Sequence, residues 1–407
     1  MNYPAADAAD FTDFTDFTPE QIERSRAYKR DVRPLVIAST TLGLAVPLVL
    51  GLTPAGAGLV RAAGDLAGGG WVARALLGSL AISLLGLVLR LPLSMWGETV
   101  SRRWGLSRRG WGLFAADTAK GFGIGAVLTA AAVAGLYFLL RHGGDGWWVW
   151  AALAAAALAV LGSFIMPVLI EPLFNKFRPL PGGELRDRLM ALVAQSGVPV
   201  RDILVSDSSK RTTAANAYVS GFGKTRRLVV WDTTADSLST EETAAVAAHE
   251  LGHAARRDVL VGTLLGAVGG AVGVALLAAA LNWTALLDAA GVTHAEDPRS
   301  QALVRAVLAV IGLVGEPWGL AYSRHIEARA DGYALDLFRE PDTIVGMERA
   351  LAVQNIADLR PRRYEVLLRY THPPIPDRIA HARRWAAEQG VAIPKSLSAG
   401  SKETDAP

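Results

Sequence analysis

The chain has 407 residues, of which 51% are hydrophobic and only 19% are charged. Soluble domains carry about 25% charged residues, so this composition indicates a membrane protein. Cysteine is absent, which excludes disulfides, thiolate metal ligands and a catalytic cysteine. The formal net charge is only +3, so the placement of the charges matters more than their sum.

The N-terminal segment, residues 1–33, is polar and acidic and has no apolar run, so no cleavable signal peptide is expected there. Its triplet repeat FTDFTDFT, residues 11–18, is interpreted as part of a solvated tail. Thr18 followed by Pro19 predicts the start of a helix, with Thr18 as the cap.

Six apolar runs reach the length of about 20 residues that a helix needs to cross a bilayer. They are residues 34–52, 72–91, 121–140, 147–170, 259–283 and 302–322. Arg74, Arg90 and Arg305 sit near ends of these runs and are expected to extend toward the membrane surface. The alternative, buried helices of a large soluble protein, is disfavoured by six such runs in one chain.

Glu316 stands out because an ionisable side chain at membrane depth is a functional hypothesis by default. Two interpretations remain open. Glu316 lines a water-filled chamber, or it satisfies backbone groups that Pro317 leaves unpaired in the sixth run.

The basic residues predict the membrane topology. Lys and Arg number five up to Arg33, five between the second and third runs, twelve in residues 171–258 and thirteen from Arg324 onward. The other three loops carry one each. The positive-inside rule therefore places both termini and both large polar segments in the cytoplasm of a multi-pass protein of the inner or plasma membrane.

The polar segment 171–258 is predicted to be a small α+β unit. Residues 171–183 form a Pro- and Gly-rich connector, residues 184–197 a helix that ends at Gly197, and residues 202–207 a short strand. Residues 214–233 read as two strands around a Gly-containing turn. Ser239 and Glu242 then fit a capping box at the start of a further helix, with Thr240 as the other candidate cap.

That helix carries AAHELGHAARRD, residues 247–258. Residues four apart lie on one helical face, so His249 and His253 can point at one metal ion. Glu250 projects beside them, where it can take a proton from water. A catalytic zinc ion needs three protein ligands and one open position, so a third ligand must come from elsewhere in the chain.

The third ligand has five candidates: His325, Glu327, Asp331, His372 and His381. In SRHIEARAD, Glu327 and Asp331 are again four apart on one helical face. Glu327 can bind the metal while Asp331 holds the N–H of a ligand histidine. The alternative is a plain charge pattern on a surface helix.

At this point the chain resembles the type I CAAX prenyl proteases, which are integral-membrane zinc metalloproteases. The matching stretches are LPLSMW, EPLFNKFRPLP, NAYVSGFGKTRRLVVWDT, HELGH, SRHIEARAD and THPPIPDR, which run from about residue 91 to 378. The resemblance implies a barrel of membrane helices around a chamber, with a small zincin-like α+β catalytic domain. The fold class is therefore a predominantly α-helical multispan membrane protein.

The resemblance also implies roles for individual residues. His249, His253 and Glu327 match the zinc ligands, and Glu250 matches the general base. Asp331 matches the carboxylate behind a ligand, His372 matches a histidine that steadies the oxyanion, and Asn216 matches a residue beside the cleavage site. From the residues alone, Asn216 and His372 read as ordinary strand-edge and loop residues, although a strand at Asn216 suits pairing with an extended peptide.

The predicted organisation has six parts. They are a cytoplasmic tail (1–33), four transmembrane helices (34–170), a catalytic segment (171–258), two transmembrane helices (259–323), a helical catalytic segment (324–394) and a disordered tail (395–407). Eukaryotic relatives have seven spans and the chain has six, and the polar insertion that some relatives carry before the zinc helix is missing. The first span is the one that this chain lacks.

The sequence thus predicts a membrane zinc endopeptidase with one Zn²⁺ per chain, acting on peptides or proteins that are lipidated or membrane-associated, without a nucleic-acid partner. Cleavage beside a prenylated cysteine and membrane-protein quality control stay open as roles. From other classes, a metal or proton transporter is disfavoured by the large polar segment outside the bilayer, and an inactive scaffold by the intact ligand set.

Overall fold

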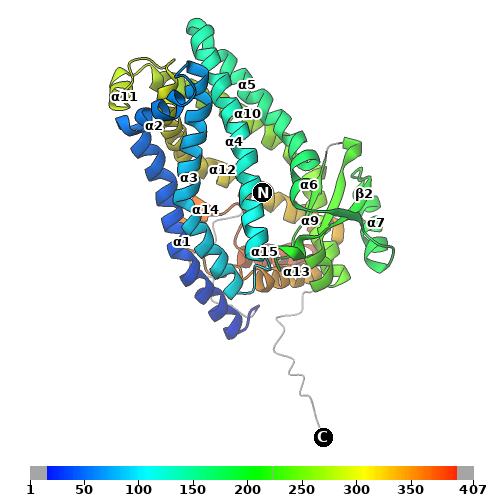
Figure 1. Ribbon diagram of the computed structural model, residues 1–407. Coiled ribbons are helices and arrows are strands. Elements are labelled where there is room, and N and C mark those ends of the chain that lie inside the picture. Colours follow the sequence, from blue (N-terminus) through cyan, green and yellow to red (C-terminus); the bar gives the residue numbers. More distant parts are fainter. Residues whose placement is uncertain (1–15, 222, 392–407) are drawn as a thin grey trace. The chain divides into compact units, whose positions relative to one another are not determined.

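The computed structural model describes residues 16–221 and 223–391 and is mostly helical (Figure 1). The predicted disorder of residues 395–407 lies outside the described residues. The chain divides into two compact units. The membrane unit comprises residues 31–174 and 260–316, and the sheet unit comprises the residues before 31, residues 175–259 and the residues from 317 onward.

Six helices among the described residues are long and apolar enough to cross a membrane, as predicted. They are α1 (Pro19–Gly51), α3 (Trp71–Arg103), α4 (Trp111–His142), α5 (Trp147–Ile165) with its continuation to Phe174, α10 (Asp258–Leu281) and α12 (Gln301–Phe338). Shorter helices α2 (Pro54–Asp65) and α11 (Thr284–Ala289) lie in the loops between spans. Figure 1 shows α3 and α4 running alongside each other.

The fourth span is irregular at its end. After α5 the chain makes a π-helical turn, Met166–Ile170, and one short helix, α6 (Glu171–Phe174). Pro167 lies in this turn and has no N–H to donate to the preceding turn, which accounts for the change of helix type.

Helices α3 and α12 approach closely in the membrane unit. A Cβ at Gly78 would lie 2.6 Å from Nε2 of Gln301, so no larger residue fits there without movement. Nearby, the buried hydroxyl of Tyr137 lies 2.7 Å from Oγ of Ser300. The guanidinium of Arg305 donates to Oγ of Ser79 at 2.9 Å.

The sheet unit contains a four-stranded sheet in the order β1-β2-β4-β3. The strands are β1 (Phe177–Pro179), β2 (Asp202–Ser206), β3 (Ala217–Ser220) and β4 (Arg227–Trp231). β2 and β4 are parallel, while β1 and β3 pair antiparallel at the two edges. Gly221 in the β3–β4 turn has a φ of +89°, and a Cβ there would lie 2.7 Å from the carbonyl oxygen of Thr225, so the turn needs glycine.

The predicted helix at residues 184–196 and the three predicted strands are all present. The connector expected at residues 171–183 is corrected by the structure, because it contains α6 and β1. β1 is only three residues long and has no alternating pattern, so it forms through its pairing with β2 rather than through its own sequence.

Helices pack on the sheet and on one another. They are α7 (Glu184–Ser196), α8 (Asp232–Ser237), α9 (Thr240–Ala255), α13 (Pro341–Gln354) and α15 (Ile375–Gln389), while α14 (Arg363–Arg369) contacts α12 through a hydrogen bond from Arg324 to the carbonyl oxygen of Val366. Their common core contains fully buried side chains from strand and helix alike, including Ile203, Leu228 and Leu251. Burial of this kind contributes about 25 cal/mol per Å² of apolar surface.

The end of the N-terminal triplet repeat is buried, contrary to the interpretation as a solvated tail. Phe17 lies in the core of the sheet unit with 7% exposure. Asp16 accepts two hydrogen bonds from the guanidinium of Arg383, at 2.5 and 3.0 Å. The cap is confirmed, since Oγ1 of Thr18 accepts from the backbone N of Gln21 and Oε1 of Gln21 accepts from that of Thr18.

Candidate metal centre

Helix α9 begins where the sequence predicts. Oγ of Ser239 accepts a hydrogen bond from the backbone N of Glu242, and Oε2 of Glu242 accepts one from the backbone N of Ser239. Most residues of this helix from Thr243 to Ala254 are buried, and many of them are alanine. This small-residue helix lets neighbouring elements approach the histidine-bearing turn closely.

Three donor atoms converge between α9 and α12. Nε2 of His249 lies 3.2 Å from Nε2 of His253 and 3.2 Å from Oε2 of Glu327. Nε2 of His253 lies 3.6 Å from Oε1 of Glu327. A zinc ion with ligand distances of about 2.0–2.1 Å holds tetrahedral ligands about 3.3–3.4 Å apart, so this triangle has the size that zinc requires.

The donor types also suit zinc, which binds imidazole nitrogen and carboxylate oxygen in open catalytic sites. Among the described residues, these three form a group of His, Asp or Glu side chains able to hold a metal ion. The other candidates, His325 and His381, are not part of that group.

Gly252 explains how the two helices come so close. A Cβ at Gly252 would lie 3.2 Å from the carbonyl oxygen of Ala330 and 3.1 Å from Cδ1 of Tyr333 on α12. Contacts this short are rare for real Cβ atoms, so glycine lets α12 bring Glu327 to the two histidines.

Each histidine is oriented by a carboxylate behind it. Nδ1 of His249 lies 2.9 Å from Oδ1 of Asp331, as the sequence predicted for one of the two histidines. Nδ1 of His253 lies 3.0 Å from Oδ2 of Asp258. Such contacts fix the tautomer and the ring orientation of metal-binding imidazoles.

Asp258 was missed because a continuous helix would point it away from His253. The structure has a break between α9 and α10, with Arg257 in the left-handed region at a φ of 57°. The break turns Asp258 back toward the site, and Nη2 of Arg329 also donates to it at 3.2 Å. Nothing in the local sequence signals this break.

Arg378 extends the network behind Asp331. Its Nε donates to Oδ2 of Asp331 at 2.9 Å, and its Nη2 lies 2.5 Å from Oδ1 of Asp331 and 2.8 Å from Oε1 of Glu348. All three side chains are buried. Arg378 is the last residue of the THPPIPDR stretch, and the sequence alone predicts no role for it. Glu348 lies on α13, and its position in the sequence does not indicate that it lies near the histidines.

Glu250, the predicted general base, lies next to His249 on α9. It is half-buried and accepts no hydrogen bond from the described part of the chain. Burial raises its pKa, and the charge of Glu327 raises it further, while the two histidines oppose this. A carboxylate with a raised pKa is a better base at neutral pH than an ordinary one.

His372 faces the same group from the segment before α15. Its Nε2 lies 3.2 Å from Oε2 of Glu327, and its Nδ1 lies 2.8 Å from Oγ1 of Thr371. The side chain is 56% exposed, so it lies at the open side of the donor triangle. From there it can reach a group bound at the metal.

Asn216 precedes edge strand β3. Its backbone N donates to Oγ1 of Thr234 at 2.7 Å, and its carbonyl oxygen accepts from the backbone N of Trp231 at 3.0 Å. The backbone is therefore held while the side chain is exposed. Glu316 on α12 is also exposed and makes no hydrogen bond within the described residues, so the structure gives no sign that it satisfies a freed backbone group.

Two family models cover most of the chain. The model for peptidase family M48 matches residues 179–386. A second model, described as the CAAX prenyl protease N-terminal region with five membrane helices, matches residues 9–176.

Individual proteins from other organisms are also similar to this chain. An uncharacterized metalloprotease, YhfN, from Bacillus subtilis (strain 168) is 29% identical over 306 residues, which are 74% of this chain and 72% of that protein. A CAAX prenyl protease 1 homolog from Caenorhabditis elegans is 25% identical over 335 residues, 75% of this chain and 76% of that protein. The crystal structure of S. mikatae Ste24p has the same fold, with a TM-score of 0.82 over 90% of each chain at 23% identity.

Replacing Asp258 with asparagine is expected to weaken zinc binding, because the amide cannot hold the His253 ring as the carboxylate does. Removing such a partner typically costs about 10–100-fold in metal affinity. The measurement is competition with a chromophoric chelator on the metal-free protein. Asp336→Asn is the control, since Asp336 lies on α12 and accepts from Trp385 instead of a ligand. Equal zinc affinity in both variants would contradict the assignment.

Zinc affinity is also expected to rise with pH. Burial opposes the charged form of both histidines, but hydrogen bonds with Asp331 and Glu327 raise the pKa of His249 to about 10, and those with Asp258 and Glu327 raise the pKa of His253 to about 9. Both pKa values exceed the ordinary histidine value of 6.5, so protonation of the two histidines stabilises the metal-free fold. This contribution is complete below pH 6.5 and is lost as the pH rises through 9 to 10.

Zinc needs neutral imidazoles, so protons compete with it below those values. Each bound proton that zinc must displace makes the apparent affinity rise about tenfold per pH unit. Chelator competition at pH 6.5, 7.5 and 8.5, corrected for the chelator's own titration, measures this slope. An affinity that stays constant over this window would refute the prediction.

Proposed function

We propose a mechanism for this chain, which belongs to peptidase family M48. The chain is a membrane-embedded metalloprotease that resembles the CAAX prenyl proteases. It is a zinc endopeptidase that hydrolyses peptide bonds at the cytoplasmic face of the membrane. The observation that carries the proposal is the triangle of His249, His253 and Glu327 donor atoms with Glu250 beside it.

The three residues of this triangle would hold one zinc ion per chain. When bound, zinc polarises a scissile carbonyl and makes a water molecule more acidic. The chain's own residues supply the other parts. Asp331 and Asp258 hold the two imidazoles with their Nε2 atoms toward the ion, and Arg378 holds Asp331 in turn.

Glu250 acts as the general base and then as the general acid. It takes the proton of the attacking water and gives it to the nitrogen of the departing amine as the C–N bond breaks. Burial raises its pKa above the ordinary value of a glutamate, which favours uptake of the proton. Its freedom from hydrogen bonds within the described residues leaves its oxygens available to the water and to the amine.

His372 steadies the oxyanion that develops on the attacked carbonyl. It lies at the exposed side of the triangle, with Nε2 facing Glu327 and Nδ1 next to Thr371. A donor aimed at the developing charge can contribute about 3–4 kcal/mol to transition-state stabilisation.

The substrate adds to the sheet as an extended strand along β3. β3 is an edge strand, so a peptide can pair with its outer side. Asn216 stands at its start with a fixed backbone and an exposed amide that both donates and accepts. This arrangement selects an extended peptide over a folded one.

The names of relatives indicate the substrate class, and the charge distribution indicates the orientation in the membrane. Several relatives carry the name CAAX prenyl protease, so a peptide with a prenylated cysteine is the first substrate to test. Damaged membrane proteins are the second, because the similar metalloprotease from Bacillus subtilis carries no substrate in its name. The Lys and Arg distribution supports cytoplasmic termini and a plasma or inner membrane location.

Glu250→Gln is expected to abolish peptide hydrolysis while retaining zinc. The amide matches the carboxylate in size but cannot accept the proton, and general-base catalysis contributes about 10²–10⁴-fold. Zinc content and cleavage of a quenched peptide, with and without a farnesylated cysteine, are measured on the purified protein. Cleavage by the variant at the wild-type rate would remove Glu250 from the mechanism, and preference for the farnesylated peptide would identify the substrate class.

Asn216→Ala is expected to raise KM about tenfold or more with a smaller change in kcat, because the lost hydrogen bonds hold the substrate in both ground and transition states. Asn282→Ala is the control, since Asn282 follows span α10 and its amide donates to the carbonyl of Ala278. Steady-state kinetics on the better of the two peptides measures the split. A loss confined to kcat would show that Asn216 does not act by positioning the substrate.

A further inference from the structure

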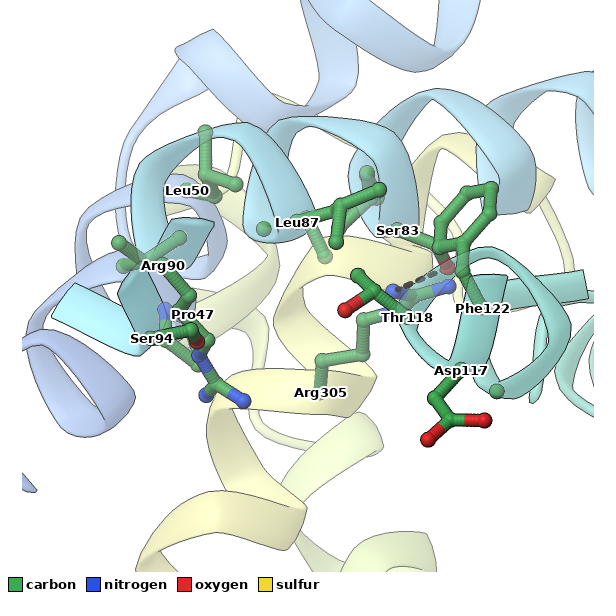
Figure 2. Close-up of a pocket in the computed structure, with 15 residues that line it drawn as sticks. Pro47, Leu50, Ser83, Leu87, Arg90, Ser94, Asp117, Thr118, Phe122 and Arg305 are labelled. Carbon is green, nitrogen blue, oxygen red and sulfur yellow. Dashed lines mark hydrogen bonds between the residues drawn. The ribbon is translucent and has the colours of Figure 1, made fainter. Parts of the chain in front are cut away.

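The membrane unit contains a cavity of about 450 Å³ between α1, α3, α4 and α12 (Figure 2). Small-molecule sites in proteins have volumes of about 300–1,000 Å³, so the cavity is large enough for a ligand. All the donor atoms of the metal centre belong to the sheet unit. None of the residues named in the proposed peptidase mechanism lines this cavity.

Arg90 stands in the cavity wall without a partner. It is exposed and makes no hydrogen bond or ion pair within the described part of the chain. Its guanidinium lies against α1, where a Cβ at Gly43 would be 3.5 Å from Nη2. Ser94, one helical turn further along α3, lines the same end of the cavity with its hydroxyl group (Figure 2).

Arg305 supplies a second cation to the wall. Its Nη2 donates to Oγ of Ser79 at 2.9 Å, and its Nη1 lies 3.4 Å from Oγ of Ser83. These partners are neutral, so its charge is not cancelled by a carboxylate among the described residues. With Asp117 as the acidic residue of the wall, two cations and one anion leave the lining with a net charge of +1.

The rest of the wall is apolar. Leu50 of α1, Leu87 of α3 and Phe122 of α4 line it (Figure 2). Leu87 lies between Ser83 and Arg90 on α3, which are seven residues or about 10 Å apart along the helix. A ligand that fills the cavity therefore meets hydrocarbon over about two helical turns and a cation at the end.

Arg90 lies at the depth of lipid headgroups. It is next to the end of the apolar run at residues 72–91 of α3, and Asp117 lies four residues before the run at 121–140 of α4. Since the loop between α3 and α4 joins these two ends, they face the same membrane surface. An anionic group bound at Arg90 thus sits near the surface, with its apolar part directed along Leu87 toward the bilayer centre.

We propose that this cavity binds an anionic phospholipid of the surrounding bilayer. The guanidinium of Arg90 and the hydroxyl of Ser94 hold the phosphate, and an acyl chain lies along Leu50, Leu87 and Phe122. Arginine suits phosphate because its planar fork donates two parallel hydrogen bonds, and basic pockets between membrane helices bind anionic headgroups. Arg305 adds positive potential without leaving its serine partners.

The test is lipid binding to the full-length protein in detergent, followed by native mass spectrometry. Phosphatidylglycerol and phosphatidylcholine with the same acyl chains are the probes. The wild type is expected to bind the anionic lipid at least five times more tightly. Arg90→Gln is expected to lower that affinity about tenfold, the effect of losing charged hydrogen bonds, and Arg61→Gln is the control because exposed Arg61 lies outside the cavity.

A second pair of variants tests the apolar part. A Cβ added at Gly121 or at Gly123 of α4 would meet no atom within 4 Å, but of these two residues only Gly121 lines the cavity. Gly121→Leu is therefore expected to block lipid binding, while Gly123→Leu is expected to leave it unchanged. Both substitutions raise the helix propensity of α4 equally, so that effect cancels in the comparison. This pair keeps the proposal testable if Arg90→Gln fails to fold.

Four results would overturn the proposal. The first is equal binding of the two lipids by the wild type, and the second is equal loss in Arg90→Gln and Arg61→Gln. The third is complete displacement of the lipid by millimolar inorganic phosphate, which would assign the site to a free anion. The fourth is displacement by the cleavable peptide, which would assign the cavity to the substrate. The proposal is supported if the preference for the anionic lipid is lost in Arg90→Gln and in Gly121→Leu but is kept in Arg61→Gln and in Gly123→Leu.

Discussion

The buried charges around His249 and His253 are the constraint on which the sheet unit depends. Two imidazoles, four carboxylates and the guanidinium of Arg378 are linked by pairwise contacts at hydrogen-bond distance, and most of them are shielded from water. A buried charge without a partner costs several kcal/mol. The network can therefore persist only if every member stays in place, and this makes the site stiff before any metal binds.

This stiffness joins elements that are far apart in the sequence. Glu327 and Asp331 come from α12, Arg378 from α15 and Glu348 from α13, while the histidines come from α9. Gly252 allows the approach of α9 to α12, and the carboxylates behind the histidines fix how the rings are turned. A catalytic geometry held by such a network needs little reorganisation during the reaction.

The sequence predicts the parts of the molecule that rest on local patterns. The six apolar runs, the capping box at Ser239, the strands and the pair of histidines on one helical face all follow from composition or periodicity. The resemblance to a protease family supplied Glu327 as the metal ligand, where the residues alone left five candidates. The structure places its carboxylate at the distance from both imidazoles that a shared zinc ion requires.

What the sequence did not predict depends on tertiary contacts. Asp258 reaches His253 only because the chain breaks at Arg257, and that break has no local signature. Glu348 and Arg378 are separated from the histidines by about a hundred residues, and no spacing connects them. Strand β1 and buried Phe17 likewise form through pairing and packing with distant segments, which overrides their weak local preference.

The donor triangle contains nitrogen and oxygen but no sulfur, and the whole chain has no cysteine. Metal centres built on thiolates lose their ligands when oxidants convert them to sulfenic acids or disulfides. This site offers no such target. Thiol-directed reagents and thiol oxidation will therefore leave its ligands intact, and occupancy of the centre will follow the supply of metal and the pH around the site rather than the thiol redox state.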